Sequence, residues 1–396
     1  MKKWAVVGLA LLFGAALAGA PSPAAAELKV GVSGYVKLDL VHMDKIAGSR
    51  PDPAPGSTPL DTDPAADNSQ TIIDARESRL RVTFSDQVAG VKMSGRIETD
   101  FLTGGGDFAS VNNHRPRLRH AFARADHPSG FSLLAGQFWS LFMNDEIAQA
   151  NTVDFNGPAG ALSARQPQLR VGYKMPLARG MGDLVLEADI ERHSVVDDTL
   201  TGDPVGAPGI LESEGQGQST PLFAGKVSWL HPRFQAEAAF AVADNKVILV
   251  GGSDASETAF GFQISVQATF DPLTVFAHYQ MIDGLARLAA GDFPTAFLVG
   301  SSVRNVEANG FYVGAAYNLT KDTSVNAVYG WAEADAIPGT FDTTDLKTHQ
   351  SIHLNIIHKF WERWQAGLEY QRFDVEAFNG TSGDLNIIRG ALWFFF

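Results

Sequence analysis

Basic side chains recur at every second position in several stretches of this 396-residue chain. Residues two apart in an extended strand point to the same side, so each stretch would place its basic groups on one face. Neighbouring strands lie about 5 Å apart, so these faces would join into a continuous basic wall. Arginines in such a wall can hold a carboxylate by a planar two-point contact and pass it onward. The members of this predicted basic ladder are Arg79, Arg81, Lys92, Arg96, Arg115, Arg117, Arg119, Arg170 and Lys174.

The same arginines could instead pair with acidic residues that alternate in the same way. Such partners are available at Glu98, Asp100, Glu187, Asp189 and Glu191. Ion pairs between these groups would satisfy both charges without any solute. We favour a role in attracting solutes, and the two roles are compatible with each other.

The elements that would position the ladder are amphipathic strands. Residues 89–101 alternate between lipid-compatible and water-compatible side chains, and the pattern recurs about sixteen times along the chain. Soluble sheets seldom enclose so many charges, whereas a closed barrel with lipid outside and water inside does. The sequence therefore predicts an all-β fold, a transmembrane antiparallel β-barrel of about 16 strands. An all-helical fold would scatter the charges around each helix, and no fixed repeat supports a solenoid.

The links between predicted strands alternate in length. Short links fall near 126–130, 176–183, 231–233, 271–272, 320–322 and 361–363, and long links near 102–114, 140–166, 194–219, 244–257, 282–308, 332–348 and 374–384. This rhythm is typical of outer-membrane barrels, which have short periplasmic turns and long external loops. Aromatic residues gather at strand ends, as they do at membrane–water interfaces.

The N-terminus has the features of a secretion signal. Lys2 and Lys3 precede an apolar stretch, and three alanines precede Glu27. We therefore predict a signal peptide at residues 1–26, a barrel domain at residues 27–396, and location in the outer membrane of a Gram-negative bacterium. The formal net charge is −13, and removal of the two signal lysines would make it −15. An acidic chain would naively prefer cations, so the placement of the charges matters more than their sum.

Four short runs resemble the DcaP-like outer-membrane porins. They are GYVKLD at 34–39, RLRHA at 117–121, LAGQFWS at 134–140 and RQPQLR at 165–170. The resemblance implies a sixteen-stranded barrel, a homotrimer, and diffusion of small, often anionic, solutes such as dicarboxylates. Members of the group often carry a periplasmic helical segment before the barrel, whereas this chain becomes strand-like at Leu28. Trimer contacts would then rest on the barrel walls.

The link at 140–166 is the candidate constriction loop. It joins the fifth and sixth predicted strands, where trimeric porins fold a loop into the lumen, and it contains enough apolar residues to pack against a wall. Its acidic side chains would face the basic ladder across a narrow passage. Alternatively, the loop could lie over the outside of the barrel or over a neighbouring subunit. The predicted constriction residues are Asp145, Glu146, Asp154 and Arg165.

These features predict a porin with a water-filled channel for passive diffusion of small hydrophilic solutes, with a preference for anions. The alternatives are an unselective or cation-preferring pore, or a surface receptor or adhesin that uses the barrel as an anchor. Expected partners are two further copies of the chain, outer-membrane lipid, lipopolysaccharide and small anionic solutes.

No motif of a catalyst is present, so we expect no enzyme activity, no catalytic residue and no cofactor. Cysteine is absent from the sequence, and His349 and His353 share a predicted strand face without further ligands, so we expect no metal site. The acidic loops disfavour binding of nucleic acid.

Overall fold

The computed structural model describes residues 28–102, 106–107, 113–145, 147–193, 220–248, 254–289, 293–336 and 345–396. The predicted signal peptide at residues 1–26 lies outside this described part. Within the described residues, no helix is both long enough and apolar enough to cross a bilayer.

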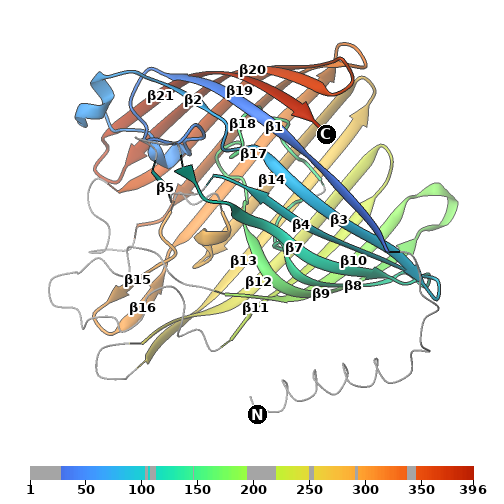
Figure 1. The fold of residues 1–396 in the computed structure, drawn as a ribbon. Coiled ribbons are helices and arrows are strands. Elements are labelled where there is room, and N and C mark those ends of the chain that lie inside the picture. Colours follow the sequence, from blue (N-terminus) through green and yellow to red (C-terminus); the bar gives the residue numbers. More distant parts are fainter. Residues whose placement is uncertain are drawn as a thin grey trace.

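Strands dominate the described structure, and seventeen of them form one antiparallel sheet (Figure 1). They are β1 (Lys29–Met43), β2 (Gln70–Asp74), β3 (Arg79–Val88), β4 (Val91–Asp100), β7 (Arg117–Asp126), β8 (Phe131–Trp139), β9 (Arg165–Pro176), β10 (Asp183–Glu191), β11 (Leu222–Leu230), β12 (Phe234–Ile248), β13 (Asp254–Phe270), β14 (Leu273–Asp283), β17 (Glu307–Asn318), β18 (Thr323–Ala334), β19 (Leu346–Phe360), β20 (Trp364–Ala377) and β21 (Ser382–Phe395). The smaller elements are two hairpins, β5 (Gly106–Asp107) with β6 (Asn113–His114) and β15 (Ala296–Val299) with β16 (Ser302–Asn305), and four 3-10 turns, η1 (Pro55–Ser57), η2 (Pro64–Asp67), η3 (Ala178–Gly180) and η4 (Ala286–Leu288).

The sheet closes on itself through its first and last strands. β1 pairs with β21 from Tyr35↔Phe395 to Met43↔Ile387. Its other edge pairs with β3 along the first half and with β2 along the second half. β2 and β3 therefore share one place in the ring, which has sixteen places among the described strands. Closure pairs the backbone groups that an open edge would expose to lipid, and it confirms the predicted sixteen-strand antiparallel barrel.

The two faces of the barrel wall differ as the alternation predicts. On β1, Val36, Leu38 and Leu40 are 54%, 49% and 51% exposed, whereas Lys37 and Asp39 between them are buried. The same contrast holds on β13 and β19, whose outward residues are apolar and exposed. Because successive side chains of a strand point to opposite faces, one wall carries a lipid-compatible exterior and a charged interior at once.

The strand ends carry the short turns and the aromatic rings. β3 and β4 are joined by Ala89 and Gly90, whose φ angles are 50° and 84°, so the two-residue hairpin needs left-handed backbone at both positions. Rings from neighbouring strands meet at this end of the barrel: Phe131 with Tyr173, Phe234 with Phe270, and Trp364 with Phe394. Such rings favour the membrane–water interface. In Figure 1 these turns lie toward the right.

The stretch between β1 and β3 is long and polar, and it contains η1, η2 and β2. β2 forms because β3 covers only the first half of the long strand β1, which leaves residues 39–43 to pair with residues 70–74. A polar strand is tolerated there because it lies at the rim.

Candidate functional site

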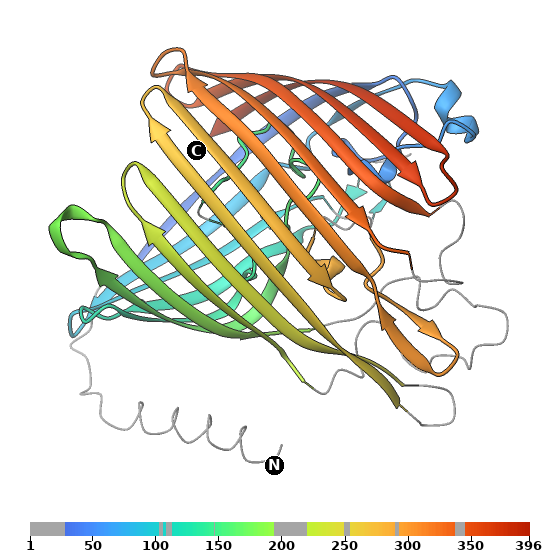
Figure 2. The same ribbon diagram turned by 180° about the vertical axis from the view of Figure 1, so that it is seen from behind.

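Residues 140–164 form a connection that crosses the inside of the barrel, and we call it the first inward segment (Figure 2). Leu141, Phe142 and Ile147 on it are fully buried. Ala159 N donates to Ser351 Oγ of β19 at 2.8 Å, and Asn355 of the same strand donates to Asn151 O at 2.9 Å. Its partners are inward-facing residues of strands far along the ring, so the segment lies within the lumen.

The segment approaches the opposite wall closely because glycines lie on both sides of the contact. A Cβ atom on Gly330 of β18 would lie 2.3 Å from Ala159 O, and one on Gly310 of β17 would lie 2.9 Å from Gly160 Cα. Gly160 itself has φ +74°, a left-handed conformation that favours glycine. Backbone therefore packs directly on backbone at this point.

Arg389 of β21 fixes the tip of the first inward segment. Its guanidinium donates to Asp154 Oδ1 at 2.9 Å and to Pro51 O at 2.6 Å, and lies 3.5 Å from Asp39 Oδ1. Glu369 of β20 accepts hydrogen bonds from Val153 N at 2.7 Å and Asp154 N at 3.2 Å. Burial raises the pKa of Asp154 to about 6, although the charge of Arg389 opposes the rise.

The acidic residues of the segment do not face the basic ladder, contrary to the expectation from the sequence. Asp145 Oδ1 accepts a hydrogen bond from Lys226 Nζ of β11 at 2.8 Å, and Asp154 pairs with Arg389. The reason is that both carboxylates lie on the side of the segment that packs against a wall, where a buried charge needs a partner. Glu146 lies outside the described residues.

Arg165 also has a different place from the one expected. It is the first residue of β9 instead of part of the loop, and its guanidinium carbon lies 4.9 Å from the centre of a Trp139 ring. The cation therefore rests against an aromatic face at the point where the first inward segment rejoins the wall.

Five arginines of the predicted ladder surround two carboxylates of β4. Arg119 donates to Glu98 at 2.7 Å and to Asp100 at 2.9 Å, and Arg117 donates to Asp100 at 2.7 Å. Arg79 and Arg96 lie 3.8 Å and 3.9 Å from Glu98, and Arg81 donates to the same carboxylate. We call these seven residues the central basic cluster: Arg79, Arg81, Arg96, Arg117, Arg119, Glu98 and Asp100. Five cations against two anions leave a formal excess of three positive charges.

The other ladder residues lie apart from this cluster. Arg170 is buried 3.5 Å from Asp189 and 4.0 Å from Glu187 on the neighbouring strand β10. Lys174 pairs with Asp183 beside a short turn, Lys92 is exposed near the start of β4, and Arg115 is exposed before β7 begins. Alternation determines which face a side chain occupies but not its height along the barrel, so the predicted ladder is a cluster with outlying members.

Phe155 connects the first inward segment to the central basic cluster. The guanidinium carbons of Arg119, Arg79 and Arg117 lie 5.0, 5.3 and 5.7 Å from the centre of its ring. The ring is thus held by cation–π contacts on one wall while its segment is bound to the other wall. A cavity of about 400 Å³ lies at this place, lined by Arg79, Arg119 and Phe155 among others.

Several charged residues of the lumen were not singled out from the sequence. Lys226, Glu237 and Arg389 are each isolated inward charges on otherwise weakly charged strands, so no spacing marked them. Glu187, Asp189 and Glu191 alternate in the sequence, and this pattern predicts only that they pair with arginines. In the structure Glu191 Oε1 accepts a hydrogen bond from Leu141 N at 2.6 Å, so it anchors the start of the first inward segment.

The two histidines considered for a metal site contact other groups. His349 stacks on Phe293 with ring centres 4.5 Å apart, and His353 Nδ1 lies 3.4 Å from Glu369 Oε1. Across the described residues, no group of three His, Asp or Glu side chains is placed to hold a metal ion.

Comparisons with known proteins agree with this architecture. Residues 20–196 match the DcaP outer membrane protein family, and residues 212–337 match the Gram-negative porin family. The outer membrane channel DcaP of Acinetobacter baumannii is 21% identical, with a TM-score of 0.75 over 96% of this chain and 100% of that chain. An anion-selective porin from Comamonas acidovorans is 12% identical, with a TM-score of 0.57 over 93% of this chain and 100% of that one. OmpF of Salmonella typhi, in complex with daunomycin, is 12% identical, with a TM-score of 0.57 over 93% and 98%. No curated protein sequence matches the chain.

The close contact between Gly330 and Ala159 predicts that a larger residue at position 330 lowers the stability of the protein. The change Gly330→Ala should lower the free energy of unfolding by about 1–3 kcal/mol, because the added methyl group overlaps Ala159 O. Gly390→Ala on β21 is the matched control, since a Cβ there would have no atom within 4 Å. Urea unfolding in detergent micelles measures the difference. Equal midpoints for the two variants would contradict the described contact.

Asp154 predicts a pH dependence of stability. Its pKa of about 6 exceeds the ordinary value of 3.8, so between these pH values the folded chain binds the proton more tightly than the unfolded chain. The stabilisation that this proton gives is fully present below pH 3.8 and is lost as the pH rises through 6. The wild type should therefore lose up to about 3 kcal/mol relative to Asp154→Asn over this range, since one pKa unit corresponds to about 1.4 kcal/mol.

Urea midpoints of the wild type and Asp154→Asn at pH 4, 5, 6 and 7 measure this difference. The asparagine variant has no group that titrates at this position and so is the reference. Parallel curves for the two proteins would show that Asp154 is not buried as described.

Proposed function

We propose that the chain is a DcaP-like outer-membrane porin and that it forms a water-filled channel for passive diffusion of small hydrophilic anions, such as dicarboxylates. The observation that supports the preference is the central basic cluster, with its excess of three positive charges beside the 400 Å³ cavity. Fixed charge inside a narrow aqueous passage raises the local concentration of ions of opposite sign.

The accessible side chains of the cluster suit this role. Arg96, Arg81 and Arg117 are 37%, 32% and 26% exposed, whereas the carboxylates that they surround are buried. A solute in the lumen therefore meets guanidinium groups before it meets Glu98 or Asp100. Arginine can bind a carboxylate through two parallel hydrogen bonds, which suits transient binding of an organic acid.

The net negative charge of the chain does not oppose the preference for anions, because several acidic side chains inside the barrel are paired with basic side chains. Asp145 and Asp154 are paired with Lys226 and Arg389 and are almost fully buried. The anion-selective porin from Comamonas acidovorans shows that the shared fold can carry such selectivity. The specific observation that favours the alternative, a cation-preferring channel, is the acidic row of Glu187, Asp189 and Glu191 on β10. An adhesin or receptor remains the alternative from another class.

We also propose that the chain is a homotrimer whose contact lies on β4, β7 and β8. A patch of small outward residues lies at the middle of these strands, where the register places Gly95 beside Ala123 and Ala123 beside Ala135. A flat surface of this kind lets two barrels approach closely, whereas bulky outward side chains on β13 or β19 suit lipid. The rest of the apolar exterior would contact outer-membrane lipid, and the rim with the long connections would contact lipopolysaccharide.

Charge reversal tests the anion preference. Arg81→Glu with Arg96→Glu should reduce the ratio of anion to cation permeability severalfold, because the excess of three positive charges becomes a deficit of one. The reversal potential of single channels in a KCl gradient across a planar bilayer measures this ratio. Lys321→Glu on a short turn makes the same kind of change on a side chain that is 89% exposed, and it should leave the ratio unchanged.

Recordings of the wild-type channel could also contradict the proposed function. A reversal potential whose sign shows cation preference would overturn the proposed anion preference, and a folded barrel that never conducts would favour the adhesin. Unchanged selectivity in the double variant would place these arginines in structural ion pairs.

A bulky substitution tests the trimer face. Ala123→Trp should convert the detergent-extracted trimer into monomers, because the ring would keep two walls apart. Ala315→Trp, an outward alanine on β17, should leave the trimer intact. Light scattering after size-exclusion chromatography gives the mass of each. Trimers from both variants would exclude this face, and a monomeric wild type would exclude the trimer.

A further inference from the structure

A second connection also enters the lumen, at residues 284–289 and 293–297, and we call it the second inward segment. We propose that it fills the half of the lumen lined by β11–β14, β17 and β18 and fixes the first inward segment there, so that solutes pass only along the side of the central basic cluster. The inference deepens the proposed channel function, because it states which element sets the size limit of that channel.

The inward wall in this half of the barrel carries an apolar patch although it faces the lumen, and the patch lies nearer the long connections than the inward charges Lys226 and Glu237. The wall residues of this patch are buried and most of them are small: Ala224, Ala239, Ala241, Ala243, Ala259, Ile282, Ala308, Ala332 and Ala334. A water-filled lumen would leave such a surface wet, at a cost that grows with its area. Small side chains also leave room between the wall and the axis of the barrel. The composition therefore suits a wall that is covered by other residues.

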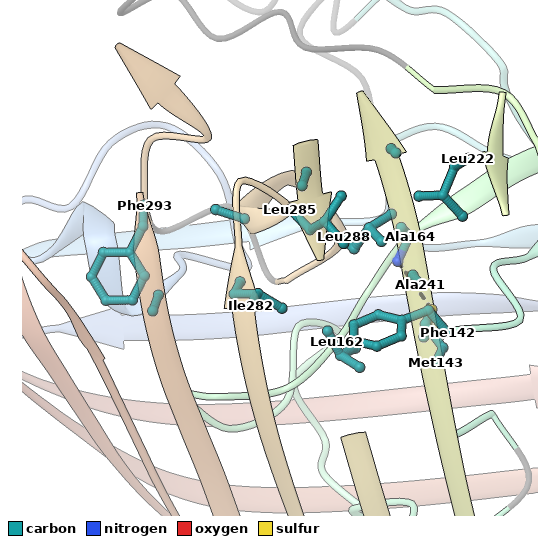
Figure 3. Packing of buried hydrophobic residues seen from close by; sticks show 14 of the residues in the cluster. Phe142, Met143, Leu162, Ala164, Leu222, Ala241, Ile282, Leu285, Leu288 and Phe293 are labelled. Carbon is teal, nitrogen blue, oxygen red and sulfur yellow. Dashed lines mark hydrogen bonds between the residues drawn. The ribbon is translucent and has the colours of Figure 1, made fainter. Parts of the chain in front are cut away.

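Both inward segments supply that cover (Figure 3). Leu141, Phe142 and Leu162 come from the first segment, and Leu285 and Leu288 come from the second. The two segments converge on Gly261 of β13, where a Cβ atom would lie 2.7 Å from the ring of Phe142 and 3.1 Å from Leu285 Cδ1. The glycine is thus needed where both segments rest on the wall.

Main-chain contacts join the two segments to each other. Ser163 N donates to Leu288 O at 3.0 Å, and Leu162 forms an antiparallel bridge with Ala289. These bonds lie close to the point where the first inward segment rejoins β9. The second segment therefore acts on the end of the first segment that Arg389 does not hold.

The connection that contains the second segment is itself fixed to three strands. Gly284 O accepts a hydrogen bond from Asn245 of β12 at 2.9 Å, and Asn305, at the end of β16 in the same connection, donates to Thr258 O of β13 at 2.9 Å. Phe293 stacks on His349 of β19. One cavity beside this segment, lined by Leu222, Leu285 and Leu288 among others, has a volume of about 10 Å³. That volume is at the lower limit for one water molecule, whereas about 400 Å³ is open beside the central basic cluster.

Paired acidic substitutions test the proposal. Leu285→Asp with Leu288→Asp would place two charges in the apolar contact, and should raise single-channel conductance about twofold and admit larger neutral sugars in liposome-swelling assays. The matched control is Val299→Asp with Ser302→Asp, which adds the same charges at the exposed tip of the β15–β16 hairpin of the same connection. It should leave both measurements unchanged. A folded Leu285/Leu288 variant with wild-type conductance and sugar limit would overturn the proposal.

A cross-link provides a test that does not depend on the folding of that variant. The chain contains no cysteine, so Leu162→Cys with Ala289→Cys introduces a single pair. Bridge partners have Cα atoms about 4.5–5.5 Å apart, within the range of a disulfide, so the oxidised pair should form in high yield and keep wild-type conductance. A folded channel in which the pair does not cross-link, or in which cross-linking changes the conductance, would contradict the described contact.

The sugar assay separates this proposal from the proposed anion preference, because neutral sugars do not respond to the charge of the lumen. A channel without anion preference whose sugar limit rises in the Leu285/Leu288 variant would overturn the preference and support the second inward segment. If the channel is anion-selective but the largest sugar that enters is unchanged in the Leu285/Leu288 variant, the anion preference is supported and the role of the second inward segment is overturned.

Discussion

The interior of this barrel depends on the pairing of buried charges. A charge removed from water is costly unless a partner of opposite sign is close, and the lumen contains many charges that the inward segments cover. Arg389 joins Asp39 of β1 to Asp154 of the first inward segment, and Lys226 joins β11 to Asp145. The ion pairs thus position the segment that divides the lumen. The central basic cluster differs, because its cations outnumber its anions and three of its arginines remain partly exposed.

The fold could be predicted from the sequence because it rests on a local rule. Period-two alternation and alternating link lengths specify an exterior, an interior and two rims without knowledge of any contact. The height of each residue could not be predicted in the same way, since it depends on register between strands. Lys92 and Lys174 share the predicted face with Arg119, yet the register places them beside the short turns. The register therefore gathers five members of the predicted ladder around Glu98 and Asp100 and places the others elsewhere.

The residues that contact the inward segments could not be predicted from local sequence patterns either, because these contacts join distant parts of the chain. Asp154 contacts a residue 235 positions away, and nothing in the sequence around either residue marks the pair. Small inward residues on β12 and β18 carried a usable signal, because a water-facing wall has no need of repeated alanine. Such a pattern on the lumen face indicates cover by another part of the chain. The link near 282–308, which contains the second inward segment, was predicted only as a long external loop.

The same ion pair determines the order in which the protein can assemble. Arg389 belongs to the last strand and Asp39 to the first, so Arg389 contacts both of its partners, Asp39 and Asp154, only after β21 has joined β1. Contacts of such long sequence separation form late, because chain entropy must be lost before they can contribute. The ion pairs of Arg389 that hold the tip of the first inward segment are therefore complete only in the closed barrel.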